Sequence, residues 1–97
     1  MAPRILCVAS NLAILENRCE ALKASSYDVS SATPQVAESL LLNQTFDLIV
    51  VSGLSGFDLQ KVNNLAGGAD MLVLSGLALP SEMLFSAGQL LDRQESA

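Results

Sequence analysis

Four polar side chains stand directly after apolar runs of the sequence: Ser10 and Asn11 after one run, Ser52 after another and Ser75 after a third. If these runs are parallel strands of an α/β sheet, their carboxyl ends meet at one rim, where such sheets bind ligands. Hydroxyl groups and the free backbone N–H groups of helix N-termini can hold a phosphate or sulfate there. Together with Gly53, Ser55 and Gly76 in the same turns, these residues are therefore candidates for an anion- or nucleotide-binding rim.

Helix capping gives a simpler explanation of the same residues. Ser and Asn cap helices, and Gly makes tight turns, without any ligand. No basic residue stands in these turns, and Gly53-x-x-Gly56 is much weaker than a dinucleotide or P-loop fingerprint. We therefore favour capping over anion binding.

The chain has no histidine and only two cysteines. Without imidazole, a Ser-His-Asp or Cys-His nucleophile pair and a His-ligated zinc or haem site are excluded within this chain. Cys7 and Cys19 are expected to be reduced, buried side chains. No two carboxylates are placed as an acid and base pair, and Asp47 is expected to cap the end of its strand opposite the rim. We therefore expect no enzyme activity, no metal and no cofactor.

Charged residues are scarce, at 15% of the chain against about 25% in ordinary soluble domains. Apolar residues are correspondingly abundant. Some of their side chains are expected to stay exposed on so small a domain, which favours association. The net charge is −5 and the five Lys and Arg residues are scattered, so nucleic acid is not expected to bind. The apolar runs are far shorter than the ~20 residues that cross a bilayer, and no signal-peptide core is visible. We expect no membrane partner and a cytoplasmic location.

Strand and helix patterns alternate along the sequence. Apolar or alternating runs predict strands at residues 4–10, 27–32, 46–51 and 71–74. Each is followed by apolar side chains at helical spacing, and the second and last helices open at Thr33-Pro34 and Pro80. Four such units with short turns predict parallel strands, right-handed crossovers and an α/β three-layer sandwich. Residues 1–92 are expected to form one domain, and residues 93–97 to fray.

Several segments resemble the receiver domains of response regulators. Residues 4–15 resemble the family's first strand and turn, residues 22–32 its passage into the second strand, and residues 46–51 the strand that presents the phosphoacceptor. Gly68-Ala69-Asp70 and residues 80–84 resemble the family's closing strand and helix. The resemblance implies a flavodoxin-like fold with strand order 2-1-3-last and a role in two-component, phosphorelay signalling.

The chain departs from the family where a receiver catalyses its own phosphorylation. Ala9 and Ser10, followed by Asn11, stand at the positions of the acidic pair that holds a divalent metal, and Ser52 stands at the position of the phosphoacceptor aspartate. Mg²⁺ needs carboxylates among its oxygen ligands, and a neutral serine without a base is a poor nucleophile. The resemblance therefore predicts a degenerate pseudo-receiver without aspartyl-phosphate chemistry.

The chain is also shorter than the family, which has five strand-helix units where this sequence has room for four. If an internal unit is deleted, Ser75 falls at the family's lysine; if the chain is truncated, Ser75 falls at the family's Ser or Thr. We favour internal deletion because the last helix matches the closing helix so well. The lysine is absent in both alignments.

The last strand, with Met71, Leu72, Val73 and Leu74, would form an edge of the sheet. It has neither charge nor proline, so another strand would pair with it unless a neighbouring segment covers it. We predict self-association through this edge, as a dimer by edge pairing or by exchange of the last strand and helix. The alternative is a monomer whose loop 76–80 or last helix covers the edge.

Two functions remain after these exclusions. The first is a non-catalytic receiver-like signalling module that binds itself or another signalling protein. The second is a small flavodoxin-like domain that binds an anion or nucleotide at the rim. We favour the first, because the resemblance is broad and the rim carries no charge.

Overall fold

A computed structural model describes residues 2–95 of the chain. Four strands and four helices alternate in it. In chain order they are β1 (Arg4–Ala9), α1 (Leu12–Ala24), β2 (Asp28–Ala32), α2 (Pro34–Asn43), β3 (Leu48–Ser52), α3 (Gly56–Leu65), β4 (Asp70–Leu74) and α4 (Pro80–Glu95).

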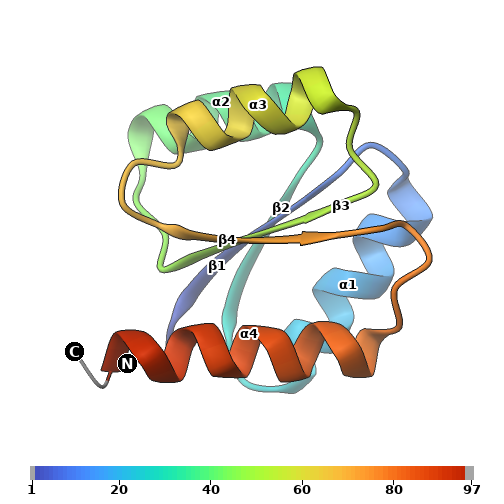
Figure 1. Cartoon of the computed structure of the whole chain (residues 1–97), viewed down its shortest axis with the longest axis vertical. Helices are drawn as coiled ribbons and strands as arrows, with labels where there is room; N and C mark the ends of the chain where they lie inside the picture. The colour runs from blue at the N-terminus through green and yellow to red at the C-terminus, as the bar shows by residue number, and fades with distance from the viewer. Residues whose placement is uncertain (1, 96–97) are drawn as a thin grey trace.

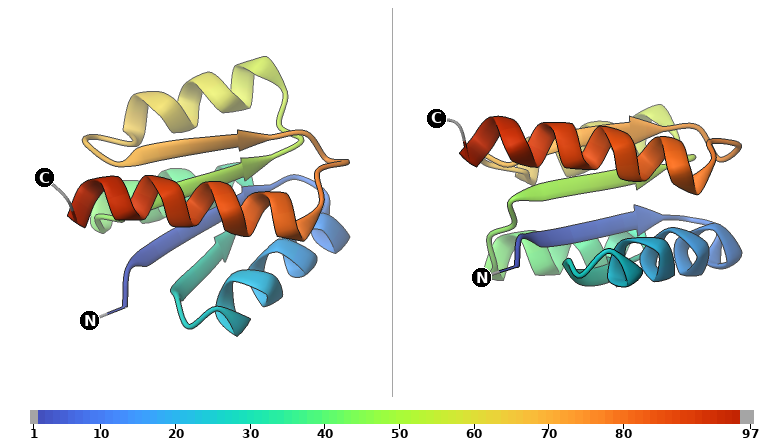
Figure 2. Two further views of the ribbon diagram at one scale, coloured as in Figure 1. Left: turned by 60° about the horizontal axis from the view of Figure 1, so that its bottom comes forward. Right: turned by 90° about the horizontal axis from the view of Figure 1, so that it is seen from below.

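The four strands form one parallel sheet in the order β2-β1-β3-β4. This confirms the predicted fold class and strand order. The central strands β1 and β3 are buried on both faces, as their continuous apolar sequences require, whereas β2 and β4 form the two edges. Figure 2 shows all strands pointing the same way, so their carboxyl ends share one rim.

Helices cover both faces of the sheet and make two separate cores. Helices α1 and α4 lie on one face, and α2 and α3 lie on the other (Figure 1). Cys7 and Val50 pack into the α1 and α4 core with Met83, while Leu6 and Ile49 face the α2 and α3 core. The alternation of neighbouring side chains along each strand separates the cores.

The position of α4 bears on the missing unit. With right-handed crossovers, a connection from β4 to a further strand beyond it would place its helix on the face of α2 and α3. Helix α4 lies on the opposite face, beside α1 (Figure 1). This is the face that the internal-deletion alignment implies for the last helix.

Every strand has at least one end that differs from the sequence expectation by one or two residues, and two differences at C-terminal ends matter most. Strand β3 runs from Leu48 to Ser52, so Ser52 is the last residue of the strand and not part of the following turn. Helix α4 reaches Glu95, beyond the domain boundary expected at residue 92, and the rest of the expected tail, residues 96–97, lies outside the described residues. In residues 2–95 no helix has the length and apolarity to span a membrane.

Candidate functional site

The rim lies where β1, β3 and β4 end side by side. Ala9 pairs with Ser52, and Ser52 pairs with Leu74, so these three residues form one row across the sheet. Gly53 follows in a left-handed conformation, with φ of 63°, and its N–H donates to the carbonyl of Leu74 at 3.0 Å. This tight turn lets the backbone pass close to Gly76.

Two polar residues near the rim cap helices. Asn11 Oδ1 accepts from the backbone N–H of Ile14 at 3.1 Å at the start of α1, so Asn11 is the cap of the two candidates, Ser10 and Asn11. Ser55 Oγ accepts from the N–H of Asp58 at 3.2 Å at the start of α3. These bonds satisfy donors that a helix start leaves unpaired, so the capping explanation holds for both residues.

The Asn11→Ala variant is expected to lose about 1 kcal/mol of unfolding free energy, the usual contribution of an N-cap side chain. Urea unfolding at neutral pH measures this loss. Ser10→Ala is the matched control and should change stability little, because Ser10 is exposed next to the cap. Equal losses in the two variants would contradict the cap assignment.

Ser75 makes a bond within its own turn. Its Oγ accepts from the N–H of Leu77 at 3.2 Å, which fixes the start of the loop between β4 and α4. The side chain is exposed. At the position that the internal-deletion alignment matches to the family's lysine, the structure therefore has a neutral turn residue.

Ser52 is enclosed at the end of β3. Only 1% of the residue is exposed, and its Oγ has no hydrogen-bond partner within the described part of the chain. Among the described residues no basic group hydrogen-bonds to the hydroxyl, and an attacking phosphodonor could not reach it. The position that matches the phosphoacceptor is therefore a neutral, sequestered oxygen.

These residues do not fit a divalent cation. Ala9 offers a buried methyl group, Asn11 Oδ1 already accepts from a backbone N–H, and Ser52 Oγ is buried. Mg²⁺ is held through one or two carboxylates in sites of this kind. Among the described residues, no group of three His, Cys, Asp or Glu side chains could hold a metal ion.

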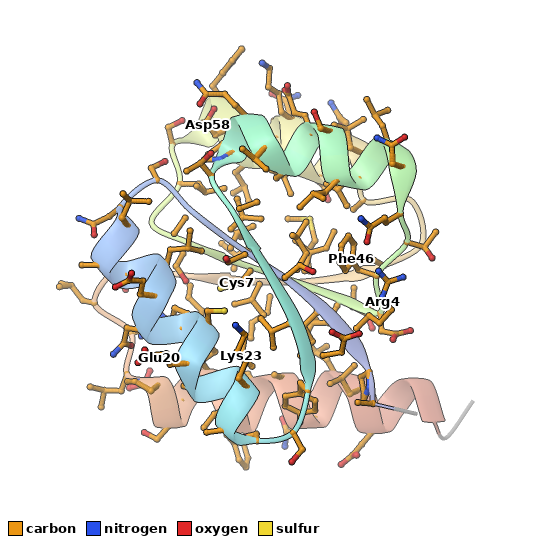
Figure 3. The ribbon with its side chains drawn as sticks, turned by 180° about the vertical axis from the view of Figure 1, so that it is seen from behind. Arg4, Cys7, Glu20, Lys23, Phe46 and Asp58 are labelled. Carbon is orange, nitrogen blue, oxygen red and sulfur yellow. The ribbon has the colours of Figure 1, made fainter. Side chains whose placement is uncertain are left out.

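Cys7 lies in β1, two residues before Ala9, and packs in the α1 and α4 core (Figure 3). The pKa of its thiol is raised from 9.0 to about 12, mainly by burial and in smaller part by the neighbouring Cys19, while Arg18 opposes the shift. Both cysteines are free and buried, as the sequence predicted. The Cys7 thiol therefore stays protonated at neutral pH and is a poor nucleophile.

At the opposite end of the sheet, Asp47 caps the strands as expected. Its Oδ2 accepts from the N–H of Arg4 at 2.8 Å, and its own N–H donates to the carbonyl of Arg4 at 2.8 Å. Arg4 also lies over the ring of Phe46, 5.2 Å from its centroid (Figure 3). Asp47 is part of a structural cluster far from the rim.

Arg18 is the residue near the rim that sequence reasoning missed. It is only 4% exposed, and it donates to the carbonyl of Ala78 in the loop before α4 and to Asn17 Oδ1 at 3.2 Å. Its Nε has no partner, and no carboxylate among the described residues forms an ion pair with it. A signal existed, because Arg18 shares the core-facing helical spacing of Leu15 and Leu22.

Strand β4 forms an edge of the sheet, as predicted, and part of it is exposed to solvent. Val73 is 56% exposed. An apolar groove of about 320 Å³ separates β4 from α3 and is lined by Gly56, Leu59, Gln60, Asn63, Met71 and Val73. Other large apolar side chains are exposed elsewhere, which agrees with the apolar excess of the sequence: Leu12, Val36, Leu42, Phe57, Leu77, Leu79 and Phe85.

Two solved structures with a similar fold are receiver domains. One is the CheY-like response regulator receiver domain protein from Methanospirillum hungatei JF-1, with a TM-score of 0.72 and 21% identity over 99% of this chain and 98% of that chain. The chain has the fold of a receiver domain. A second neighbour is the signal receiver domain of a putative Luxo repressor protein from Vibrio parahaemolyticus, with a TM-score of 0.67 and 14% identity over 98% of this chain and 94% of that one.

Sequence comparison adds no relative to this receiver-like domain, since no protein-family model and no curated protein matches the chain. The structural neighbours match nearly the whole chain, with 99% and 98% of it covered. The chain thus combines the receiver fold with a rim of neutral side chains.

Proposed function

We propose that this receiver-like domain is a signalling module of two-component type that cannot be phosphorylated and that acts through protein–protein association. The observation that carries the proposal is the row Ala9, Ser52 and Leu74 across the rim of a receiver fold. None of these side chains can bind a cation or receive a phosphoryl group as a carboxylate does. Cytoplasmic residence and the absence of enzyme activity belong to the same proposal.

The chemistry of phosphoryl transfer supports this proposal. The transition state needs positive charge around the equatorial oxygens, normally from a metal ion and a lysine or arginine. Ser75 is neutral, and the guanidinium of Arg18 is buried beneath the loop carbonyl of Ala78. The rim therefore has neither the nucleophile nor the charge for the reaction.

A Mg²⁺ titration followed by calorimetry tests the proposal. We expect no saturable heat at millimolar Mg²⁺, because the rim positions hold no carboxylate. A receiver domain with its acidic pair intact serves as the positive control. Saturable binding that Ser10→Ala or Asn11→Ala weakens would contradict the proposal.

The exposed edge supports association as the mode of action. Val73 presents an apolar side chain on an edge strand that carries neither lysine nor proline. The loop after β4 turns away from the edge, because Arg18 binds Ala78 and Ile14 packs close to Gly76. A second copy, or another signalling protein, is the expected partner.

Arg18 favours a second candidate function, the binding of an anion near the rim. Arg18 borders a cavity of about 280 Å³ between α1 and the loop before α4, lined also by Ala13, Ile14, Asn17, Gly76, Ala78 and Pro80. A buried cation without a carboxylate partner is costly, and a bound anion would offset that cost. The start of α4 adds a favourable helix dipole.

Thermal unfolding with inorganic phosphate or a nucleoside monophosphate tests this second function. A bound anion would raise the melting temperature of the wild-type protein with increasing ligand concentration. The Arg18→Met variant, which keeps the length of the side chain, should lose that response. An equal response in both proteins, or no response in either, would reject the anion site.

A further inference from the structure

We infer that two copies of this domain pair edge to edge through β4, antiparallel and with Leu72 on the two-fold axis, so that their sheets join into one. This inference rests on the proposed function and names its partner as a second copy of the chain. It follows from the direction of the backbone groups of β4, from its side chains and from what surrounds it.

Two residues of β4 have backbone N–H and C=O groups that face outward from the edge of the sheet. The carbonyl of Leu74 accepts from the N–H of Gly53, so Leu74 faces β3. The direction of the backbone N–H and C=O groups alternates along a strand. Those of Leu72 and Asp70 therefore also face β3, while those of Met71 and Val73 point outward from the edge of the sheet. The N–H and C=O groups of Met71 and Val73 are therefore the ones that a neighbouring strand would meet.

One antiparallel register pairs all of these groups. When Leu72 lies opposite Leu72 of the second copy, Met71 lies opposite Val73, and each such pair can exchange both of its backbone hydrogen bonds. A register centred on Met71 or on Val73 would pair only one of these residues within the strand. Backbone hydrogen bonding thus selects the register centred on Leu72.

The side chains of β4 suit the same register. Met71 packs in the α2 and α3 core, and Val73 borders the groove between β4 and α3. Leu72 packs in the α1 and α4 core. Pairing would bring Met71 against Val73 on one face and Leu72 against its copy on the other. Every cross-strand contact at the centre is then apolar, which stabilises antiparallel pairs.

The two edges of the sheet differ in a way that favours β4. Strand β2 carries Asp28, which forms an ion pair of 4.0 Å with Arg4, and its sequence ends in Ser30, Ser31 and Ala32. Charge and polar side chains protect an edge from pairing. Strand β4 carries a charge only at its first residue, Asp70, away from the centre of the proposed register.

The helices leave the β4 edge accessible. Figure 1 looks onto β4, with α3 above it and α4 below it, and neither ribbon crosses in front of the strand. The groove between α3 and β4 leaves room for the side chains of a second strand on that face. The expected alternative, a loop or helix that covers the edge, is not what the described residues show.

Cysteine cross-linking tests the register. Under mild oxidation, Leu72→Cys should form a covalent dimer, because residues opposite each other in a non-hydrogen-bonded pair lie within disulfide distance. Val73→Cys alone should not, whereas a mixture of Met71→Cys and Val73→Cys should give the mixed dimer. The wild-type protein, whose two cysteines are buried, is the background control.

Light scattering after size exclusion tests the edge itself. The wild-type protein should elute as a dimer at micromolar concentration, and Val73→Lys as a monomer with an unchanged circular dichroism spectrum. Val36→Lys is the matched control, since Val36 is 51% exposed on α2, and it should remain a dimer.

Three outcomes would overturn the inference. The first is a wild-type protein that is a monomer. The second is a dimer that survives Val73→Lys, which an exchange of β4 and α4 between chains would give. The third is cross-linking of the Val73→Cys variant by itself. A monomer that takes up no Mg²⁺ or phosphoryl group would leave the phosphorylation part of the proposed function intact. Phosphorylation of a proven dimer would contradict the phosphorylation part of the proposed function and leave the pairing through β4 intact. The two failures are therefore distinguishable.

Discussion

The Ser52→Asp variant is expected to lose about 3–5 kcal/mol of unfolding free energy at neutral pH, the cost of an unpaired buried charge. Ser52 is 1% exposed, and its neighbours across the sheet, Ala9 and Leu74, offer neither cation nor donor side chain. Restoring the phosphoacceptor residue alone should therefore damage the fold and not recover the family's chemistry. Urea unfolding at neutral pH measures the loss.

The loss should shrink in acid. Burial raises the pKa of an aspartate carboxyl above its unfolded value of about 3.9, so the folded variant binds a proton more readily than the unfolded one. Its stability relative to the wild type therefore rises as pH falls through the folded pKa towards about 4. Ser52→Ala is the matched control and should be neutral or slightly stabilising, because it removes an unpaired hydroxyl. A stable Ser52→Asp variant at neutral pH would mean that the rim can hold a carboxylate.

Alkaline pH is expected to destabilise the protein through Cys7. Burial raises the pKa of this thiol from 9.0 to about 12, so between these values the unfolded chain loses a proton that the folded chain keeps. Stability from this group is complete below pH 9 and falls as pH rises, at about 1.4 kcal/mol per pH unit. By pH 11 the loss amounts to roughly 3 kcal/mol.

The Cys7→Ala variant isolates this effect from the other groups that titrate in the same range. The variant should be less stable at neutral pH, because it leaves a small cavity, but its stability should fall less steeply above pH 9. Urea unfolding from pH 8 to pH 11 compares the two slopes. Parallel pH profiles would show that Cys7 is not the buried thiol that the structure describes.

The fold could be predicted from the sequence because its strongest signals are local. The apolar run 5–9 and the stretch 46–51 overlap most of the two central strands, and Asn11 and Thr33-Pro34 mark helix starts. Right-handed connections and the family resemblance then left one strand order, which the structure has.

The parts of the site that escaped prediction depend on contacts between distant residues. Arg18 lies in the middle of α1 and meets Ala78, which is 60 residues away in sequence, so no local pattern pairs them. Ser52 was expected in a turn, but the ladder with Ala9 and Leu74 extends β3 by that residue and buries its hydroxyl. Such burial follows from packing, which no spacing in the sequence encodes.

The most direct test of the central claim is phosphoryl transfer itself. The wild-type protein is incubated with Mg²⁺ and acetyl phosphate, and its intact mass is measured beside that of a receiver domain with the complete acidic site. We predict that the mass stays unchanged while the control gains one phosphoryl group. A phosphoryl group on the wild-type chain would contradict the account.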